Sequence, residues 1–302
     1  MAVVFSAELP FRSPYHLHKL TYGSGRPVVS VISGLHGNEL NGIHSVNLLN
    51  MMLQMKKNLS GTVHIFPLVN SFGADECQKH WPLTNEDINK AFPGDLNGGL
   101  VQRIAASIMA ETANSDVVID VHSGASHIRE LPQVRSPISG KLLELARATE
   151  LPLIWKREGL HLQRDGLVGA CLQRGQMALR IMGGRGITLD AKLSTRMADG
   201  LSSILASMGI LKAKPPSSES LEIFNSQIHT FRASSGGFFV PDIRVGDSVN
   251  VGHTLGHLQS PIGGERLESL RSEGEGVVVT VRANPMVHAH ELLVRLAYRA
   301  SP

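Results

Sequence analysis

The chain has 302 residues, of which 42% are hydrophobic and 18% are charged, so it is long enough to form one large globular domain or two unequal ones. A formal net charge of only +3, scattered Lys and Arg residues and 5% aromatic residues argue against a nucleic-acid-binding protein. No apolar run reaches the length of a membrane span and the two cysteines form no disulfide framework, so we expect a soluble, cytoplasmic protein that does not enter a membrane.

The N-terminal part of the chain predicts a strand, a tight turn and a helix. Residues 1–20 contain two prolines and are expected to be irregular or edge structure. Residues 28–32 form an apolar, β-branched run, residues 33–39 include two glycines, and residues 40–55 are amphipathic. This order is typical of a core strand that turns sharply into a helix.

The next segments continue the alternation of strands and helices. Residues 62–69 are rich in β-branched residues and predict a second strand. Residues 70–95 show no periodicity, and a loop this long in a compact domain is usually functional. Residues 100–113 have helical spacing, and residues 116–122 read as a buried strand that ends at a histidine.

Further alternation completes a large α/β domain. A short helix is predicted at 141–149, strands at 151–155 and 177–182, and a helix at 189–211. Alternating strands and helices favour a largely parallel sheet with functional loops at the carboxyl ends of its strands. We therefore predict an α/β domain over residues 1–213.

The composition changes after a linker at residues 214–220, which is rich in Pro and Ser. Short β-like runs separated by glycines then predict a small all-β barrel or sandwich, which we place at residues 222–302. The predicted strands are 238–240, 248–251, 254–258, 276–281 and 292–296.

Three side chains predict a metal site. His36 and Glu39 lie three residues apart in the glycine turn, and both are residue types that bind zinc. A catalytic zinc usually has three protein ligands, and His122 at the end of a later strand is the candidate for the third. Asp120 shares a strand face with His122 and is expected to orient its imidazole.

The same motifs resemble a known family. The segments G-L-H-G-N-E at residues 34–39 and D-V-H-S at 120–123 are similar to those of the succinylglutamate desuccinylase/aspartoacylase family, relatives of the zinc carboxypeptidases. D-I-N-K-A-F-P-G at 87–94 resembles that family's D-L-N-R-x-F-P-G segment. The glycine-rich runs at 235–249 and 275–278 resemble its lipoyl-like barrel-sandwich domain. The resemblance covers most of the chain. It implies a zinc carboxypeptidase-like domain, with a mostly parallel mixed sheet flanked by helices, followed by the barrel-sandwich.

The resemblance also implies a hydrolase that holds one zinc ion per chain and cleaves an amide of a small anionic N-acyl amino acid-like substrate. Water bound to zinc would attack the amide carbonyl, with a glutamate as general base. The substrate carboxylate would be held by Asn89 and Lys90, where the family has an Asn-Arg pair. Lys79 would stabilise the oxyanion, with His80 as the alternative.

The family's base glutamate is missing from the corresponding segment. Counting back from the glycine pair at the end of the predicted strand gives Ile181, and a shift of one residue gives Arg180. Neither can act as a base at neutral pH, and general acid–base catalysis contributes roughly 10²–10⁴-fold in rate. Glu130, on the loop expected after His122, is a candidate replacement, and Glu158 and Asp190 are others.

Two further arginines are candidates for substrate binding. Arg135, on the same expected loop, and Arg180, if its side chain points into the site, would both favour an acidic ligand. Two functions therefore stay open: a deacylase with an altered acid–base apparatus, and a zinc-retaining pseudoenzyme or binding protein, or a relative with non-hydrolytic chemistry. A β domain able to cover a neighbour's site is also compatible with a homo-oligomer.

Overall fold

The computed structural model describes residues 1–137, 140–157, 165–212 and 220–298. One sheet of 13 strands runs through these residues and carries most of the fold. Its path is β1-β2-β4-β3-β5-β8-β6-β15-β17-β10, with β7 and β12 paired to β6 and β15, and β9 paired to β7. The strands are β1 (Ala2–Ala7), β2 (Tyr15–Ser24), β3 (Val28–Ser33), β4 (Gly61–Phe66), β5 (Val117–Ser123), β6 (Ile128–Pro137), β7 (Leu153–Arg157), β8 (Met177–Gly184), β9 (Leu221–Phe224), β10 (Ile228–Arg232), β12 (Ser248–Val249), β15 (Gly276–Arg282) and β17 (Leu292–Tyr298).

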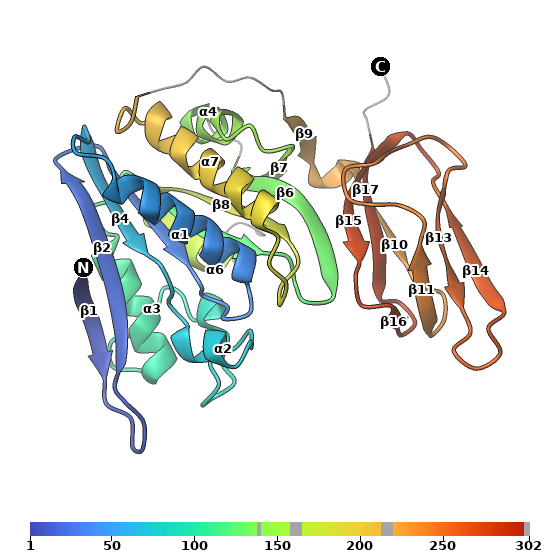
Figure 1. Cartoon of the computed structure of the whole chain (residues 1–302), viewed down its shortest axis with the longest axis horizontal. Helices are drawn as coiled ribbons and strands as arrows, with labels where there is room; N and C mark the ends of the chain where they lie inside the picture. The colour runs from blue at the N-terminus through green and yellow to red at the C-terminus, as the bar shows by residue number, and fades with distance from the viewer. Residues whose placement is uncertain (138–139, 158–164, 213–219, 299–302) are drawn as a thin grey trace.

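Helices cover both faces of the N-terminal part of this sheet, so this part has three layers (Figure 1). Helices α1, α4 and α7 pack on one face, and α3 and α6 pack on the other. The helices are α1 (Leu40–Gln54), α2 (Ser71–Asp75), α3 (Leu100–Glu111), α4 (Gly140–Ala148), α6 (Gly166–Gln173) and α7 (Ala191–Ser207), with 3₁₀ turns η1 (Ile88–Lys90) and η2 (Asn225–Gln227).

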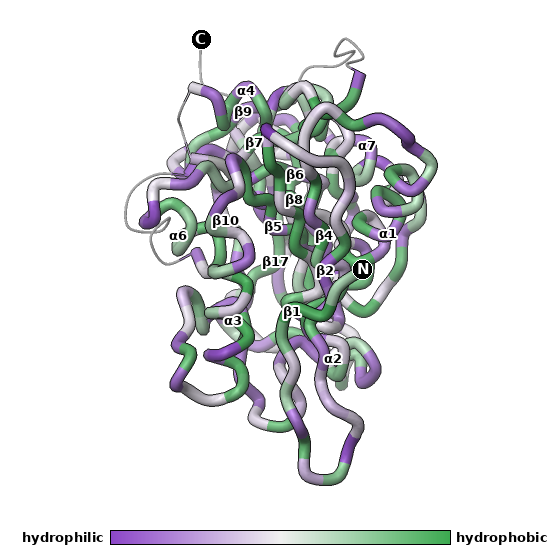
Figure 2. Tube along the Cα trace, turned by 90° about the vertical axis from the view of Figure 1, so that its left-hand side faces the viewer, coloured by the Kyte–Doolittle hydropathy of each residue, from purple (hydrophilic) through white to green (hydrophobic). Residues whose placement is uncertain are grey.

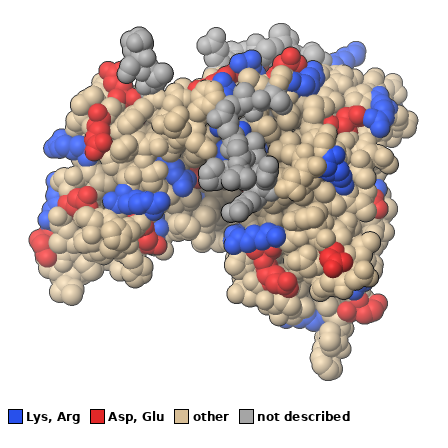
Figure 3. Space-filling model, turned by 180° about the vertical axis from the view of Figure 1, so that it is seen from behind, with Lys and Arg blue, Asp and Glu red and all other residues tan. Residues whose placement is uncertain are grey.

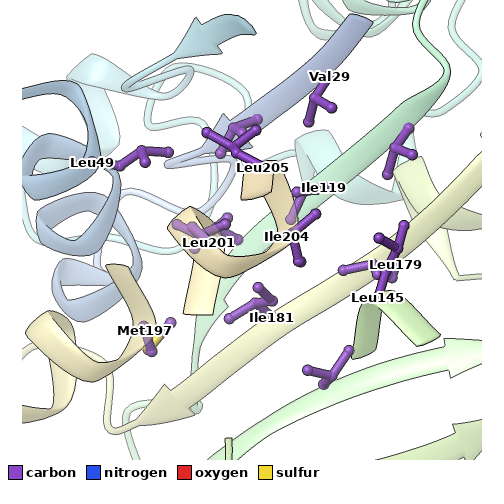
Figure 4. Close-up of a cluster of buried hydrophobic side chains, with 14 of the residues drawn as sticks. Val29, Leu49, Ile119, Leu145, Leu179, Ile181, Met197, Leu201, Ile204 and Leu205 are labelled. Atoms are coloured by element: carbon purple, nitrogen blue, oxygen red, sulfur yellow. The ribbon is translucent and has the colours of Figure 1, made fainter. Parts of the chain in front are cut away.

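The strands at the centre of the sheet are parallel and apolar. β4, β3, β5 and β8 run parallel to one another, whereas β2 and β6 pair antiparallel with β4 and β8. All residues of β5 are buried, and β5 and β8 appear mostly hydrophobic in Figure 2. Buried side chains of α7, such as Leu201 and Ile204, meet Ile119 of β5 and Ile181 of β8 in one apolar cluster (Figure 4). The predicted mixed α/β fold is confirmed.

The C-terminal part is a sandwich of two sheets and not a closed barrel. A four-stranded sheet, β14-β13-β11-β16, shares an apolar core with β15 and β17 of the large sheet. Its strands are β11 (Gly237–Pro241), β13 (Thr254–Gln259), β14 (Arg266–Arg271) and β16 (Met286–Val287). Of the two expected alternatives, a barrel or a sandwich, the structure shows the sandwich, since the edge of β15 pairs with β12 and then with β6 of the α/β part.

Several local expectations are corrected. Residues 1–20, expected to be irregular or edge structure, hold β1 and most of β2, which pair as an antiparallel hairpin at the edge of the sheet, so the edge alternative is correct and the irregular one is not. The segment after His122 contains the ten-residue strand β6 where a loop was expected, because prolines and charged residues hide its strand pattern. Helix α6 was not predicted, and the expected loop at 70–95 contains α2 and η1. The predicted linker lies almost wholly outside the described residues.

In Figure 3 the Lys and Arg side chains alternate with Asp and Glu over the described part of the face that is shown. Among the described residues, no helix has the length and apolar character needed to cross a membrane.

Candidate active site

A glycine turn after β3 places two of the predicted metal ligands. Gly34 has a positive φ of 67°, a conformation that side chains with a Cβ rarely adopt. Gly37 lies so close to the backbone of Gly73 that a Cβ would approach its carbonyl carbon to 2.0 Å. Only glycine therefore fits at these two positions, and the turn presents His36 and Glu39 at the carboxyl edge of the sheet.

The structure brings His36, Glu39 and His122 together. One carboxylate oxygen of Glu39 lies 2.7 Å from Nδ1 of His36, and the other lies 2.7 Å from Nδ1 of His122. All three side chains are buried, and their candidate ligand atoms lie within 4.8 Å of one another. This His-Glu-His group has the donor set of a zinc site and could hold a metal ion.

Each histidine of the group is backed by an aspartate. Nε2 of His36 pairs with Oδ1 of Asp87 at 2.9 Å. Nε2 of His122 lies 2.7 Å from Oδ1 of Asp120, although the geometry of that contact is not that of a standard hydrogen bond. Aspartates in these positions fix the orientation of metal-binding imidazoles. Asp120 was predicted in this position, whereas the role of Asp87 was missed although its segment had been singled out.

Burial and charge act together on the ionisation of the group. Burial alone would raise the pKa of Glu39, but His122 and His36 hold it well below its usual range. Burial alone would lower the pKa of His122, but Asp120 and Glu39 raise it to about 9. The carboxylates therefore stabilise a positive charge on His122, and they would stabilise a bound cation in the same way.

Strand β8 carries no carboxylate towards the site. Ile181 points into the apolar core, while Arg180 and Met182 line the cavity beside the histidines. Arg180 donates to Oδ2 of Asp120 from Nε at 3.0 Å and from an amino nitrogen at 2.8 Å, and to Oδ1 of Asp165 at 2.6 Å. The positive charge of Arg180 is thus neutralised by two carboxylates, so its guanidinium has little remaining capacity to pair with a substrate anion.

A cavity of about 420 Å³ opens beside the His-Glu-His group, and Glu130 lines it. The carboxylate of Glu130 is buried and accepts hydrogen bonds from Oγ1 of Thr280 at 2.6 Å and from Nε2 of Gln133 at 3.3 Å. Arg295 lies 3.5 Å from its other oxygen. Thr280 and Arg295 belong to β15 and β17, so the C-terminal part helps to form the cavity.

Three arginines surround one tryptophan at the same side of the cavity. The guanidinium carbons of Arg135, Arg157 and Arg295 lie 4.8, 5.7 and 6.0 Å from the ring centre of Trp155. Burial and the neighbouring guanidinium groups lower the pKa of Arg135 to about 10, although Glu130 opposes the shift. Arg135 and Arg295 line the cavity and lie 3.6 and 3.5 Å from the same oxygen of Glu130, whereas the carboxylate that acts on Arg157 is that of Asp165. The cluster therefore favours an anionic ligand.

The remaining predicted residues divide between the cavity and the surface. Lys79 lines the cavity mouth and pairs with Asp87 at 2.9 Å. Asn89 also lines the cavity, with its Oδ1 accepting the backbone N–H of Leu167 at 3.1 Å. Lys90 is exposed and lines a different hollow, while His80 bonds to an asparagine away from the cavity.

The other two candidate bases do not enter the site. Glu158 lies outside the described residues. Asp190 caps the N-terminus of α7, where its carboxylate accepts the backbone N–H of Leu193 at 3.1 Å. Among the candidate bases in the described part of the chain, only Glu130 faces the cavity.

The chain is similar in sequence to proteins of one enzyme family. Residues 26–207, more than half of the chain, match the family model described as the succinylglutamate desuccinylase/aspartoacylase catalytic domain. The N-alpha-acetyl-L-2,4-diaminobutyric acid deacetylase of Halomonas elongata is 29% identical over 125 residues, which are 41% of this chain. That match spans 36% of the relative, or about a third of its length.

Solved structures share the fold over nearly the whole chain. The product-bound ectoine utilization protein EutE (DoeB) from Ruegeria pomeroyi matches with a TM-score of 0.82 and 18% identity, covering 95% of this chain and 90% of that one. An aspartoacylase family protein from Mesorhizobium loti gives 0.81 and 22%, covering 96% and 91%. At these identities the similarity establishes the fold.

Proposed function

Because the chain belongs to the succinylglutamate desuccinylase/aspartoacylase family, we propose that it is a zinc-dependent deacylase that hydrolyses an amide bond of a small, anionic N-acyl amino acid-like compound. The observation that carries the proposal is the buried His-Glu-His group at the edge of a cavity lined by arginines. The relatives' names describe deacylases and a deacetylase, which supports the same reaction class.

His36, Glu39 and His122 would hold one zinc ion. Two imidazole nitrogens and a carboxylate are a ligand set of catalytic zinc sites, and both histidines have the supporting aspartates that such ligands need. Zinc, when bound, supplies an acidified water and polarises the substrate carbonyl. The chain's other residues then supply orientation, charge and proton transfer.

Glu130 is our candidate for the proton transfer. It lines the cavity, it is buried, and it reaches the site from β6 instead of β8. As a carboxylate it would accept a proton from the attacking water and pass it to the leaving amine. Its hydrogen bonds to Thr280 and Gln133 would hold it in one orientation.

The cations of the cavity would bind and polarise the substrate. Arg135, helped by Arg295, is placed to pair with the substrate's anionic group, with Asn89 as a polar contact. Lys79 at the cavity mouth would stabilise the developing oxyanion. Arg180 borders this site but is already paired with two aspartates. We therefore propose that it holds Asp120 in position and adds to the positive electrostatic potential of the cavity.

A second candidate function is a zinc-retaining pseudoenzyme or binding protein, or a relative with non-hydrolytic chemistry. The specific observation in its favour is β8, which presents Arg180 and Met182 to the cavity in place of a carboxylate. In either case the ligand is a small molecule. We propose a cytoplasmic location as well, which is supported by two free cysteines of which Cys77 is exposed.

Elemental analysis of the purified protein tests the metal site. We expect about one zinc per chain in the wild type and its loss in both His36→Ala and His122→Ala. His80→Ala, which changes a histidine outside the cavity, is the matched control and should keep the metal. Metal that persists in both ligand variants would rule out this site.

A screen of N-acyl amino acids for amine release tests the reaction. We expect release that depends on zinc and is stopped by a chelator, with anionic substrates preferred over their amides. Stoichiometric zinc without amine release from any substrate would favour the second candidate function.

A further inference from the structure

A second cavity, of about 570 Å³, lies in the C-terminal part of the molecule. It opens between β15 of the large sheet and β11 of the four-stranded sheet, at the end of the sandwich that meets β6. None of its lining residues lines the cavity beside the His-Glu-His group, so the two spaces are separate. Open ends of β-structures and junctions between parts of a fold are frequent sites of small-molecule binding.

The floor of this second cavity is apolar. Phe239, Ile243 and Val281 line it, and each of them also belongs to the buried core of the sandwich. The core is therefore continuous with the cavity, because the sandwich does not close into a barrel at this end. A ligand with an apolar body would remove this floor from water, which favours binding.

The rim is cationic. Arg129, Arg185, Arg244 and Arg282 line the cavity, and no Asp or Glu does so among the described residues. Arg282 is held by Glu291 at 2.9 Å, and Arg185 donates to the backbone oxygen of Ser126 at 2.6 Å.

The other two rim arginines are available to a ligand. The side chains of Arg129 and Arg244 are exposed, and they make no hydrogen bond or ion pair with any residue that the structure describes. Both arginines therefore line the cavity with side-chain donors that no described residue occupies.

Strand alternation explains why this cavity has a different chemistry from the first one. Glu130 of β6 is the cross-strand partner of Thr280 of β15, and their side chains meet beside the first cavity. Arg129 and Val281, one residue away on each strand, are also partners and point to the opposite face. One pair of strands thus separates a cavity with a carboxylate from a cavity with free arginines.

We propose that this second cavity binds an amphipathic organic acid, in which a carboxylate pairs with Arg129 and Arg244 and an aliphatic or aromatic body covers Phe239 and Val281. The free cations select the carboxylate and the apolar floor selects the body, so neither a small inorganic anion nor a neutral hydrocarbon satisfies the whole site. The proposal does not depend on the reaction at the first cavity.

Isothermal titration of the 302-residue chain with three eight-carbon probes, octanoate, octylammonium and octanol, tests this proposal. We expect saturable 1:1 binding of octanoate, at least tenfold tighter than that of either other probe. The double variant Arg129→Gln/Arg244→Gln should weaken octanoate at least tenfold. Both changes are on exposed side chains, so the fold should not be affected.

Two control variants locate the probe. Arg266→Gln changes an exposed arginine of β14 that lines neither cavity, and it should leave octanoate binding unchanged. Arg135→Gln changes the first cavity and should also leave it unchanged. The proposal fails if octanoate does not bind, if octanol binds equally well, or if Arg135→Gln weakens octanoate more than the double variant does.

Discussion

The orientation and charge of the two histidines in the His-Glu-His group depend on the carboxylates around them. His122 lies between Glu39 and Asp120, and His36 lies between Glu39 and Asp87. Without a metal, the two carboxylates next to His122 keep a proton on it, since its pKa is raised to about 9. A metal ion and this proton compete for the same imidazole, so metal binding must respond to pH.

We therefore expect metal binding to release a proton from His122. The apparent affinity should rise about tenfold per pH unit below pH 9 and then level off, because the imidazole loses its proton there. The stability of the metal-free protein should change with pH in the opposite direction. The contribution of charged His122 to the free energy of unfolding is complete below pH 6.5 and is lost as the pH rises through 9. Calorimetric titration with zinc in buffers of different ionisation enthalpy measures the released proton. An affinity independent of pH between 6 and 8 would contradict the assignment.

Glu130 is the residue on which the choice between enzyme and binding protein depends. If it is the base, Glu130→Gln should lower kcat by roughly 10²–10⁴-fold while zinc content stays at the wild-type level. The comparison of kcat with metal stoichiometry separates loss of the base from loss of the site. Gln133→Leu, which removes a hydrogen bond to Glu130 but no carboxylate, is the matched control and should have a smaller effect. Unchanged kcat in Glu130→Gln would remove this residue as base.

Strand β6 is the element that joins the parts of the site. It pairs with β8, β7 and β15, and it carries Glu130 and Arg135 towards the first cavity and Arg129 towards the second. Arg129 and Glu130 are neighbours in the strand and point to opposite faces. Arg135, five residues after Glu130, lines the same cavity as Glu130 because the pairing of β6 with β8 shifts register between Glu130 and Gln133. The hydrogen bond from Thr280 to Glu130 crosses from the C-terminal part to the α/β part.

We expect Thr280→Val to cost about 1–3 kcal/mol of stability, since it leaves a buried carboxylate oxygen without its hydroxyl donor. Valine has nearly the same shape, so the loss should come from the hydrogen bond alone. Chemical unfolding measures the change, and Thr280→Ser, which keeps the hydroxyl, should recover most of it. Equal losses in both variants would mean that packing of the methyl group matters more.

At the scale of the whole molecule, the predicted boundary between two domains falls inside one continuous sheet. β6 pairs with β15 and β7 pairs with β9, so hydrogen bonds cross from the first part of the chain to the second at two places. Leu131 and Trp155 also share an apolar cluster with Val279 and Ala297. We expect these contacts to couple the folding of the two parts.

We therefore expect the full chain to unfold in a single cooperative thermal transition. A chain that ends at residue 212 should be much less stable and should aggregate, because the edges of β6 and β7 and their apolar side chains would be exposed. Differential scanning calorimetry of both proteins measures this. Two separated transitions in the full chain, one of them unchanged in the short chain, would instead support two independent domains.

The sequence by itself determined the elements whose signal is local. The apolar strands at the centre of the sheet, the glycine turn with His36 and Glu39, and the candidate His122 at the end of a later strand all follow from patterns within a few residues. Fold class follows from the same patterns, since alternating strands and helices can bury their apolar faces in few ways.

Only the tertiary structure decided which polar side chains share a cavity. Asp87 reaches His36 across 51 residues, and Thr280 reaches Glu130 across 150. Strand β6 was hidden by its own prolines and charges, of which Glu130 is paired with Thr280 and Arg295 on two other strands. Lys90, placed in the site by its position in a motif, lies at the surface instead. Buried charged side chains are paired with partners that lie close in the fold but far away in the sequence. The spacing of residues in the sequence therefore does not show which of them face the same cavity.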